Sequence, residues 1–105
     1  MKTQGVILLF FDLPVLTASE RHNYQHFVKN IKKEGFVSLQ KSIYIKQIGN
    51  IKTKQQDIRK ISNMSPSEGT IYALTLSQDQ FARMNIILGE KPNIKFDHIL
   101  VISNE

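Results

Sequence analysis

The strongest candidate for a functional group is Asp12, which stands directly after an unbroken apolar run at residues 6–11. A run of β-branched, leucine and aromatic residues predicts a strand covered on both faces, and Pro14 cannot continue a strand ladder. The carboxylate is therefore expected at the carboxyl end of a buried strand. Alternatively, Asp12 only begins an Asx-type turn before the next helix, as an aspartate ahead of a proline commonly does.

Two histidines, His22 and His26, stand four residues apart, a spacing that lets two imidazoles on one helix share a metal ion. The residues between them are asparagine, tyrosine and glutamine, so the glutamate base of an H-E-x-x-H zinc protease is missing. A solvated polar helix face is the better interpretation of this pair.

Basic side chains form a second candidate site. Those that follow the first predicted helix into the next hairpin are expected to contact nucleic-acid phosphates: Arg21, Lys29, Lys32, Lys33, Lys41 and Lys46. The chain carries 14 Lys and Arg against 9 Asp and Glu, a net charge of +5, which favours an anionic partner such as nucleic acid. Alternatively, these lysines are only a solvated helix surface.

Length and composition limit the number of domains and exclude several kinds of site. The 105 residues predict one domain, spanning 1–105, because a chain of this length forms a single core. The absence of cysteine excludes disulfides, thiolate nucleophiles and cysteine-built zinc sites, and it suits a cytoplasmic protein. No apolar run approaches the ~20 residues of a membrane helix and no leader pattern opens the chain, so we expect no membrane contact.

The elements that must position Asp12 can be placed from periodicity. Apolar residues at helical spacing predict a helix over residues 19–34, with a capping box at Thr17 and Glu20 and a glycine stop at Gly35. Residues 36–39 and 42–48 predict a hairpin with its turn at residues 40–41. Asn50 is expected to cap a second helix that breaks at residues 65–66, and residues 69–76 predict a fourth strand.

Beyond the fourth strand, Ser77 is expected to cap a single helical turn, and residues 85–88 and 98–102 read as β-like pieces separated by a loop. The order strand, helix, strand, strand, helix, strand predicts an α+β, ferredoxin-like βαββαβ fold with an additional C-terminal strand at about 98–103.

The open face of this sheet is expected to be apolar, because strands one and four carry apolar residues on both faces. Two such domains packed sheet to sheet would cover it, so a homodimer is predicted. The terminal strand is expected to pair with an exposed edge of a partner. Its partner-binding residues would be Ile99, Leu100, Val101 and Ile102.

Short motifs follow one another along nearly the whole chain. They are Phe11-Asp12-Leu13-Pro14, Thr17, Glu20-Arg21, Tyr24, Phe27, Gly35-Phe36, Leu39-Gln40, Ser42-Ile43-Tyr44, Ile58-Arg59, Gly69, Leu74-Thr75, residues 80–84 and Gly89-Glu90-Lys91. In order and spacing they resemble the small CRISPR-associated adaptation protein family "Cas two". The later block is most similar to the type II branch of that family.

The resemblance implies a ferredoxin-like homodimer that bridges two dimers of the integrase subunit, "Cas one", and double-stranded DNA during capture of new spacers. Some members are also magnesium-dependent nucleases on RNA or DNA, in which the aspartate at the Asp12 position faces its dimer mate and holds the metal. By this resemblance Asp12 is the expected catalytic and metal-binding residue, and Mg²⁺ is the expected cofactor.

Three function classes stay open at this point. In the first, the dimer is a scaffold for DNA and integrase, and Asp12 does no chemistry. In the second, Asp12 and its mate bind Mg²⁺ in a nuclease, which includes a stand-alone toxin-like ribonuclease. The third is a nucleic-acid-binding module without catalysis, such as an RNA-recognition module, but Gly35-Phe36-Val37 matches only a fragment of its aromatic motif.

Overall fold

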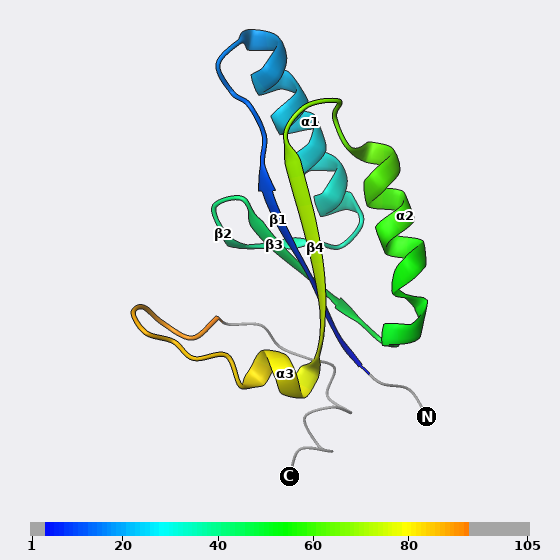
Figure 1. Cartoon of the computed structure of the whole chain (residues 1–105), viewed down its shortest axis with the longest axis vertical. Coiled ribbons are helices and arrows are strands. Elements are labelled where there is room, and N and C mark those ends of the chain that lie inside the picture. The colour runs from blue at the N-terminus through cyan, green and yellow to red at the C-terminus, as the bar shows by residue number, and fades with distance from the viewer. Residues whose placement is uncertain (1–3, 93–105) are drawn as a thin grey trace.

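The computed structural model of the chain describes residues 4–92 (Figure 1). Its elements are β1 (Gly5–Asp12), α1 (Ala18–Lys33), β2 (Val37–Gln40), β3 (Ile43–Ile48), the 3-10 helix η1 (Ile51–Thr53), α2 (Lys54–Met64), β4 (Thr70–Ser77) and α3 (Gln78–Ala82). This order confirms the predicted α+β, ferredoxin-like βαββαβ fold. None of the helices in this range is long and apolar enough to cross a membrane.

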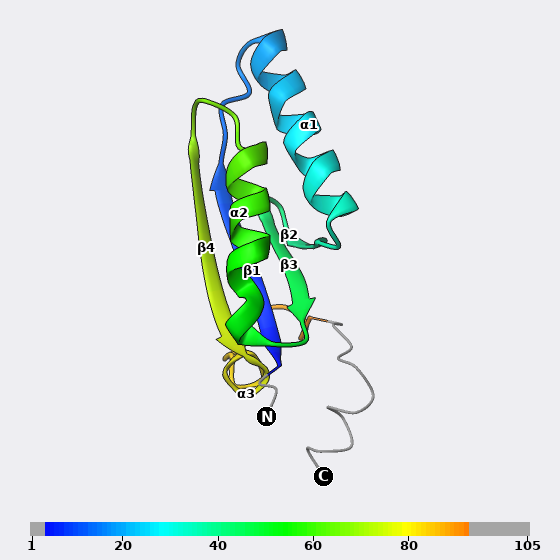
Figure 2. The ribbon, with the colours of Figure 1, turned by 90° about the vertical axis from the view of Figure 1, so that its right-hand side faces the viewer.

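The four strands form one antiparallel sheet in the order β2-β3-β1-β4, with β1 and β3 at its centre. Helices α1 and α2 form a second layer, as the edge-on view of Figure 2 shows. Because side chains alternate between the two faces of a strand, the odd-numbered residues of β1 face the helices and the even-numbered residues face the open side. Asp12 is therefore directed away from the helical layer.

The boundaries of α1 have the predicted chemistry. The Thr17 hydroxyl accepts a hydrogen bond from the backbone N–H of Glu20, and the Glu20 carboxylate accepts one from the backbone N–H of Thr17, which completes a capping box. At the other end, Gly35 has a φ of +100°, a conformation that favours glycine. These signals explain why the helix was predictable to within one residue at each end.

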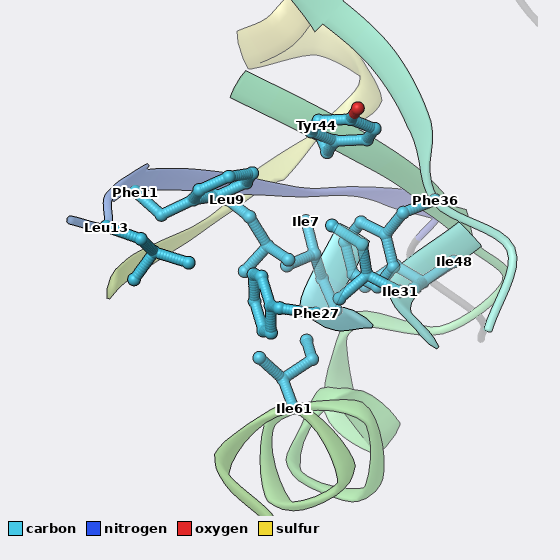
Figure 3. Packing of buried hydrophobic residues seen from close by; sticks show 10 residues of the cluster. All are labelled: Ile7, Leu9, Phe11, Leu13, Phe27, Ile31, Phe36, Tyr44, Ile48 and Ile61. Atoms are coloured by element: carbon cyan, nitrogen blue, oxygen red, sulfur yellow. The ribbon is translucent and has the colours of Figure 1, made fainter. Parts of the chain in front are cut away.

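The main core lies between the sheet and the helices (Figure 3). At one end of it, the Phe11 ring is in edge contact with the Phe27 ring of α1, at 5.2 Å between centroids, and is stacked on the Tyr44 ring of β3 at 5.6 Å. Ile61 closes this core from α2. Burial of such side chains is the main stabilising contribution of the fold, at about 1.5 to 3 kcal/mol for each large apolar residue.

A second apolar cluster lies on the open face of the sheet, which is apolar as the sequence predicted. Val6, Leu8 and Ile45 pack there against Phe81 of α3. Residues 84–92 run beside this face and enclose with it a groove of about 510 Å³ that Leu8 and Phe10 help to line. Much of the face nevertheless stays open to solvent.

Three details differ from the sequence prediction. Asn50 caps the 3-10 helix η1, which precedes α2, and the N-cap of α2 itself, Thr53, makes no side-chain hydrogen bond. Residues 85–88 form no strand, because no neighbouring strand pairs with them in the described structure, and the side chains of Ile87 and Leu88 are accordingly 97% and 95% exposed. The β2–β3 turn consists of Lys41 and Ser42, one residue later than predicted, because Ser42 adopts a φ of +62° and cannot continue the strand. The predicted terminal strand, about 98–103, lies outside the described residues.

An ion pair between β3 and α2 gives a first testable prediction. Lys46 Nζ lies 2.6 Å from Asp57 Oδ1, and the two side chains are only 22% and 18% exposed. We expect Asp57→Asn to lower the free energy of unfolding by about 1 kcal/mol, because the lysine loses its negatively charged partner at a partly desolvated site and the remaining hydrogen bond is weaker. Urea denaturation measures this change.

The control for this prediction is the pair between Lys60 and Glu34, whose atoms are 3.3 Å apart and whose lysine is 61% exposed. Lys60→Gln should change the free energy of unfolding by less than about 0.5 kcal/mol, because exposed ion pairs contribute little. Equal losses in the two variants would contradict the structural role assigned to the Lys46 pair.

Candidate functional site

Asp12 is the last residue of β1, where it pairs with Thr70 of β4. Its side chain is exposed, whereas its neighbours Phe11 and Leu13 are buried in the core. No hydrogen bond or ion pair within residues 4–92 engages its carboxylate, including the local backbone hydrogen bond that an Asx-type turn requires. The backbone of Asp12 is thus fixed while its carboxylate remains available to a ligand.

Gly69 lets the start of β4 approach this end of β1 closely. Its φ is +105°, and a Cβ atom at this position would lie 2.8 Å from the carbonyl oxygen of Asp12 and 2.7 Å from the side chain of Leu13. A larger residue would therefore have to displace the backbone beside Asp12. The glycine contributes to the site through backbone geometry and carries no functional group of its own.

An open cleft of about 320 Å³ adjoins Asp12, where the β2–β3 turn and the beginning of β4 meet the end of β1. The polar residues that line it are Asp12, Lys41, Ser42, Thr70 and Tyr72. An acidic residue, a basic residue and the hydroxyl-bearing Thr70 and Tyr72 therefore border one solvent-accessible space together with the apolar Phe10 and Ile43, whereas the Ser42 hydroxyl is engaged with Tyr24 of α1. Such a set can bind a phosphodiester, because lysine attracts the phosphate and hydroxyls donate to its oxygens.

A magnesium ion would use the Asp12 carboxylate as its ligand. The described residues contain no group of three or more side chains able to hold a metal, and Asp12 is the one acidic residue among the described residues that line the cleft. Mg²⁺ is commonly held by one or two carboxylates together with substrate phosphate oxygens and waters. The site therefore fits a magnesium ion if a second copy contributes its own Asp12.

The predicted phosphate-binding residues are not gathered into one surface. Lys41 lines the Asp12 cleft. Lys29, Lys32 and Lys33 are all exposed, but they belong to α1 and thus to the helical layer, on the other side of the sheet from the open face. The structure thus separates one lysine beside Asp12 from a group of three on α1.

Two predicted phosphate ligands already have partners within the fold. Nη1 of Arg21 donates hydrogen bonds to the carbonyl oxygens of Val15 and Leu16, at 3.2 and 2.9 Å, and so fixes the loop between β1 and α1. Lys46 is held by Asp57, and its ammonium lies 6.0 Å from the centroid of the Phe36 ring. A role for these two residues in nucleic-acid binding stays a prediction, and neither lies in the Asp12 cleft.

The histidine pair lies on the exposed surface of α1. The rings of His22 and His26 are nearly parallel, with centroids 6.1 Å apart, and they have no acidic partner that would complete a metal site among the described residues. This agrees with a polar helix face.

Sequence reasoning missed Ser42, Thr70 and Tyr72 as residues of the cleft. Strand periodicity could have placed Thr70 and Tyr72 on one face of β4, but their neighbours depend on the register between β1 and β4, which pairs Asp12 with Thr70 and Phe10 with Tyr72. No sequence pattern predicted the positive φ of Ser42.

Comparison with known proteins decides the family. The family model for the CRISPR associated protein Cas2 matches residues 6–84, which is most of the chain. The chain belongs to the Cas2 family. This confirms the resemblance found in the sequence, while assignment to the type II branch stays a prediction.

Several curated Cas2 proteins are similar to the chain over most of its length. A CRISPR-associated endoribonuclease Cas2 of Treponema denticola is 42% identical over 84 residues, covering 80% of this chain and 83% of the relative. Proteins of the same name from Ligilactobacillus salivarius and Streptococcus mutans are 36% and 38% identical, over 81% of this chain and 84% and 79% of the relatives. The family match at residues 6–84 includes the end of β1, the β2–β3 turn and the beginning of β4, which build the Asp12 site.

Proposed function

We propose that this Cas2-family chain acts as a homodimer that cleaves phosphodiester bonds with Mg²⁺ and that bridges the integrase subunit, Cas one, and double-stranded DNA during spacer acquisition. The observation that carries the catalytic part is the exposed Asp12 carboxylate, which has no partner within residues 4–92 and shares an open cleft with Lys41. RNA is the preferred substrate in this proposal, because the relatives are named endoribonucleases.

The proposed dimer rests on the open face of the sheet. Tyr72 and Leu74 of β4 are 68% and 48% exposed, and they pair with Phe10 and Leu8 of β1 on the same face. An apolar sheet face of this kind rarely stays uncovered in a soluble protein. A second copy packed sheet to sheet would cover it and would bring two Asp12 carboxylates toward one axis.

Each residue of the cleft has a proposed task in cleavage. The two Asp12 carboxylates would hold the metal, and Lys41 would attract and orient the scissile phosphate by its charge. Magnesium, when bound, would stabilise the negative charge that develops on the phosphate oxygens. The hydroxyls of Thr70 and Tyr72 would donate to the remaining oxygens and fix the position of the backbone.

The scaffold part of the proposal uses other surfaces. The lysines of α1 would contact the phosphates of duplex DNA without reading its sequence. Ile99, Leu100, Val101 and Ile102, outside the described residues, would dock on the integrase as an added strand. These surfaces need no chemistry at Asp12, so the two activities can be tested separately.

The decisive experiment compares the purified chain alone with the chain mixed with a Cas one integrase subunit. We expect Mg²⁺-dependent cleavage of single-stranded RNA by the chain alone and spacer integration only by the mixture. Integration without any cleavage would leave the scaffold as the sole function, and cleavage without any integration would indicate a stand-alone ribonuclease.

Binding to duplex DNA should depend steeply on salt and little on sequence. Lys32 and Lys33 are exposed in the last turn of α1. Replacing both with glutamate should lower the affinity by about tenfold or more at low salt, and it should flatten the plot of log affinity against log salt, because fewer counterions are released. Fluorescence anisotropy at several salt concentrations measures both quantities.

The matched variant for this experiment is Lys41→Glu, which reverses one charge in the Asp12 cleft and not on α1. It should weaken duplex binding less than the double variant does, yet impair RNA cleavage more. An affinity that is indifferent to salt would show instead that the positive charge of α1 is only solvated surface.

A further inference from the structure

Ser42 has a backbone conformation that its residue type does not favour. It is the second residue of the two-residue β2–β3 turn, its φ is +62°, and no other non-glycine residue described in the structure has a positive φ. Glycine or asparagine normally occupies such a turn position. Left-handed residues other than glycine cluster at functional sites, where surrounding contacts hold them in place.

Two contacts hold Ser42 in this conformation. Its carbonyl oxygen accepts a hydrogen bond from the backbone N–H of Phe11 at 3.0 Å, one residue beyond the last β1–β3 pair. Its Oγ lies 3.3 Å from the hydroxyl oxygen of Tyr24 in α1, in a partly buried hydrogen bond. The Tyr24 ring in turn contacts the Phe11 ring, with centroids 5.9 Å apart.

Ser42, Tyr24 and Phe11 thus each contact the other two at the end of β1. Phe11 is buried on the helical side, and Asp12, the next residue, is exposed on the opposite side. Fixing the backbone of Phe11 therefore also fixes the direction of the Asp12 side chain. The same turn presents Lys41 to the cleft that Asp12 lines.

We infer that Ser42 and Tyr24 are positioning residues of the Asp12 site, and that the hydrogen bond between their hydroxyls sets the geometry of the carboxylate toward a divalent cation. The inference rests on the proposed metal-dependent function. It assigns no contact with substrate to either residue, since their hydroxyls act through Phe11 and the turn.

The test uses Mn²⁺ as a paramagnetic probe, whose binding to the full chain is measured by water proton relaxation, alongside RNA cleavage. Tyr24→Phe and Ser42→Ala each remove one hydroxyl. Both should weaken Mn²⁺ binding by about threefold to tenfold and lower kcat by about tenfold with little change in KM, because misplacement of a ligand acts on the chemical step. Asp12→Asn should abolish the binding and serves as the reference.

Tyr44→Phe is the matched control. The Tyr44 ring also stacks on Phe11, but Tyr44 makes no hydrogen bond to Ser42 in the described structure. This variant should bind Mn²⁺ and cleave RNA as the parent does. Ser42→Gly distinguishes the effect of the missing hydroxyl on the Asp12 position from an effect on fold stability. Glycine removes the hydroxyl but accepts a positive φ without strain. This variant should melt no lower than Ser42→Ala yet show the same loss of Mn²⁺ affinity.

Parent-like Mn²⁺ affinity in Tyr24→Phe and Ser42→Ala would overturn the inference, as would an unimpaired Ser42→Gly. A parent that binds Mn²⁺ but never cleaves would refute the proposed catalysis alone, and the affinities of the variants would still decide the inference. A parent that neither binds Mn²⁺ nor cleaves would overturn both.

Discussion

Asp12→Asn should abolish metal-dependent cleavage and leave the fold intact. Asparagine has the same shape as aspartate and keeps one side-chain oxygen, but it removes the negative charge that attracts the cation. In a dimer both charges disappear at once, so we expect a loss of at least about 100-fold in cleavage rate, since metal stabilisation of the transition state is worth several kcal/mol. A single-turnover assay with labelled RNA and Mg²⁺ measures this loss.

Stability should not follow activity in this variant. The Asp12 side chain is exposed and has no partner within the described chain, so the free energy of unfolding should change by less than about 0.5 kcal/mol. The dimer should be equally stable or more stable, because repulsion between two carboxylates is relieved. Spacer integration should survive, because the proposed scaffold does no chemistry at this residue.

Asp79→Asn is the control for this experiment. Asp79 is also exposed, but it lies in the first turn of α3, which follows the opposite end of β4 from the Asp12 pair (Figure 1). Its replacement should leave cleavage unchanged. If the Asp12 variant cleaves as fast as the parent, the assignment of this residue as a metal ligand is wrong. A parent that is inactive with both Mg²⁺ and Mn²⁺ would leave only the scaffold function.

The fold could be predicted largely from local signals. The apolar run at residues 6–11, the capping box at Thr17 and the glycine at Gly35 each determine a boundary through interactions with near neighbours in sequence. Residues 85–88 show the limit of such signals. Their β-branched and apolar character is typical of a strand, but a strand exists only where a neighbour pairs with it.

The candidate site was predictable only in part, for a related reason. Asp12 was identified because the residues beside it mark the end of a strand. The group around it depends on contacts between distant segments, such as the turn at Ser42 and the start of β4 at Thr70. The lysines were identified by charge alone, and charge does not say on which side of a sheet a helix will present them.

Leu74→Lys is expected to dissociate the proposed dimer. Leu74 lies in the middle of β4, on the open face. Leu74 pairs with Leu8 and is 48% exposed in the single chain. A lysine at this position can reach solvent in a monomer, so Leu74→Lys should stay folded by circular dichroism. In a dimer packed sheet to sheet, each copy would place one lysine in the interface. Both charges would be buried without an acidic partner, which makes the free energy of association less favourable by several kcal/mol.

We therefore expect the dissociation constant of the dimer to rise by about 100-fold or more. Light scattering of the parent at micromolar concentration should give twice the chain mass of 12.1 kDa, and Leu74→Lys should give the monomer mass. Gln55→Lys, at an exposed position of α2 in the helical layer, adds the same charge away from the proposed interface and should remain dimeric.

The Leu74 variant also tests whether the site needs two copies. Asp12 is the one acidic residue among the described residues that line the cleft, so a folded monomer should lose Mg²⁺-dependent cleavage although its own Asp12 is unchanged. Raising the protein concentration until the variant dimerises should restore cleavage. A parent that is a stable monomer would remove the argument from the apolar face, and a monomeric variant that cleaves at the parental rate would show that one Asp12 is sufficient.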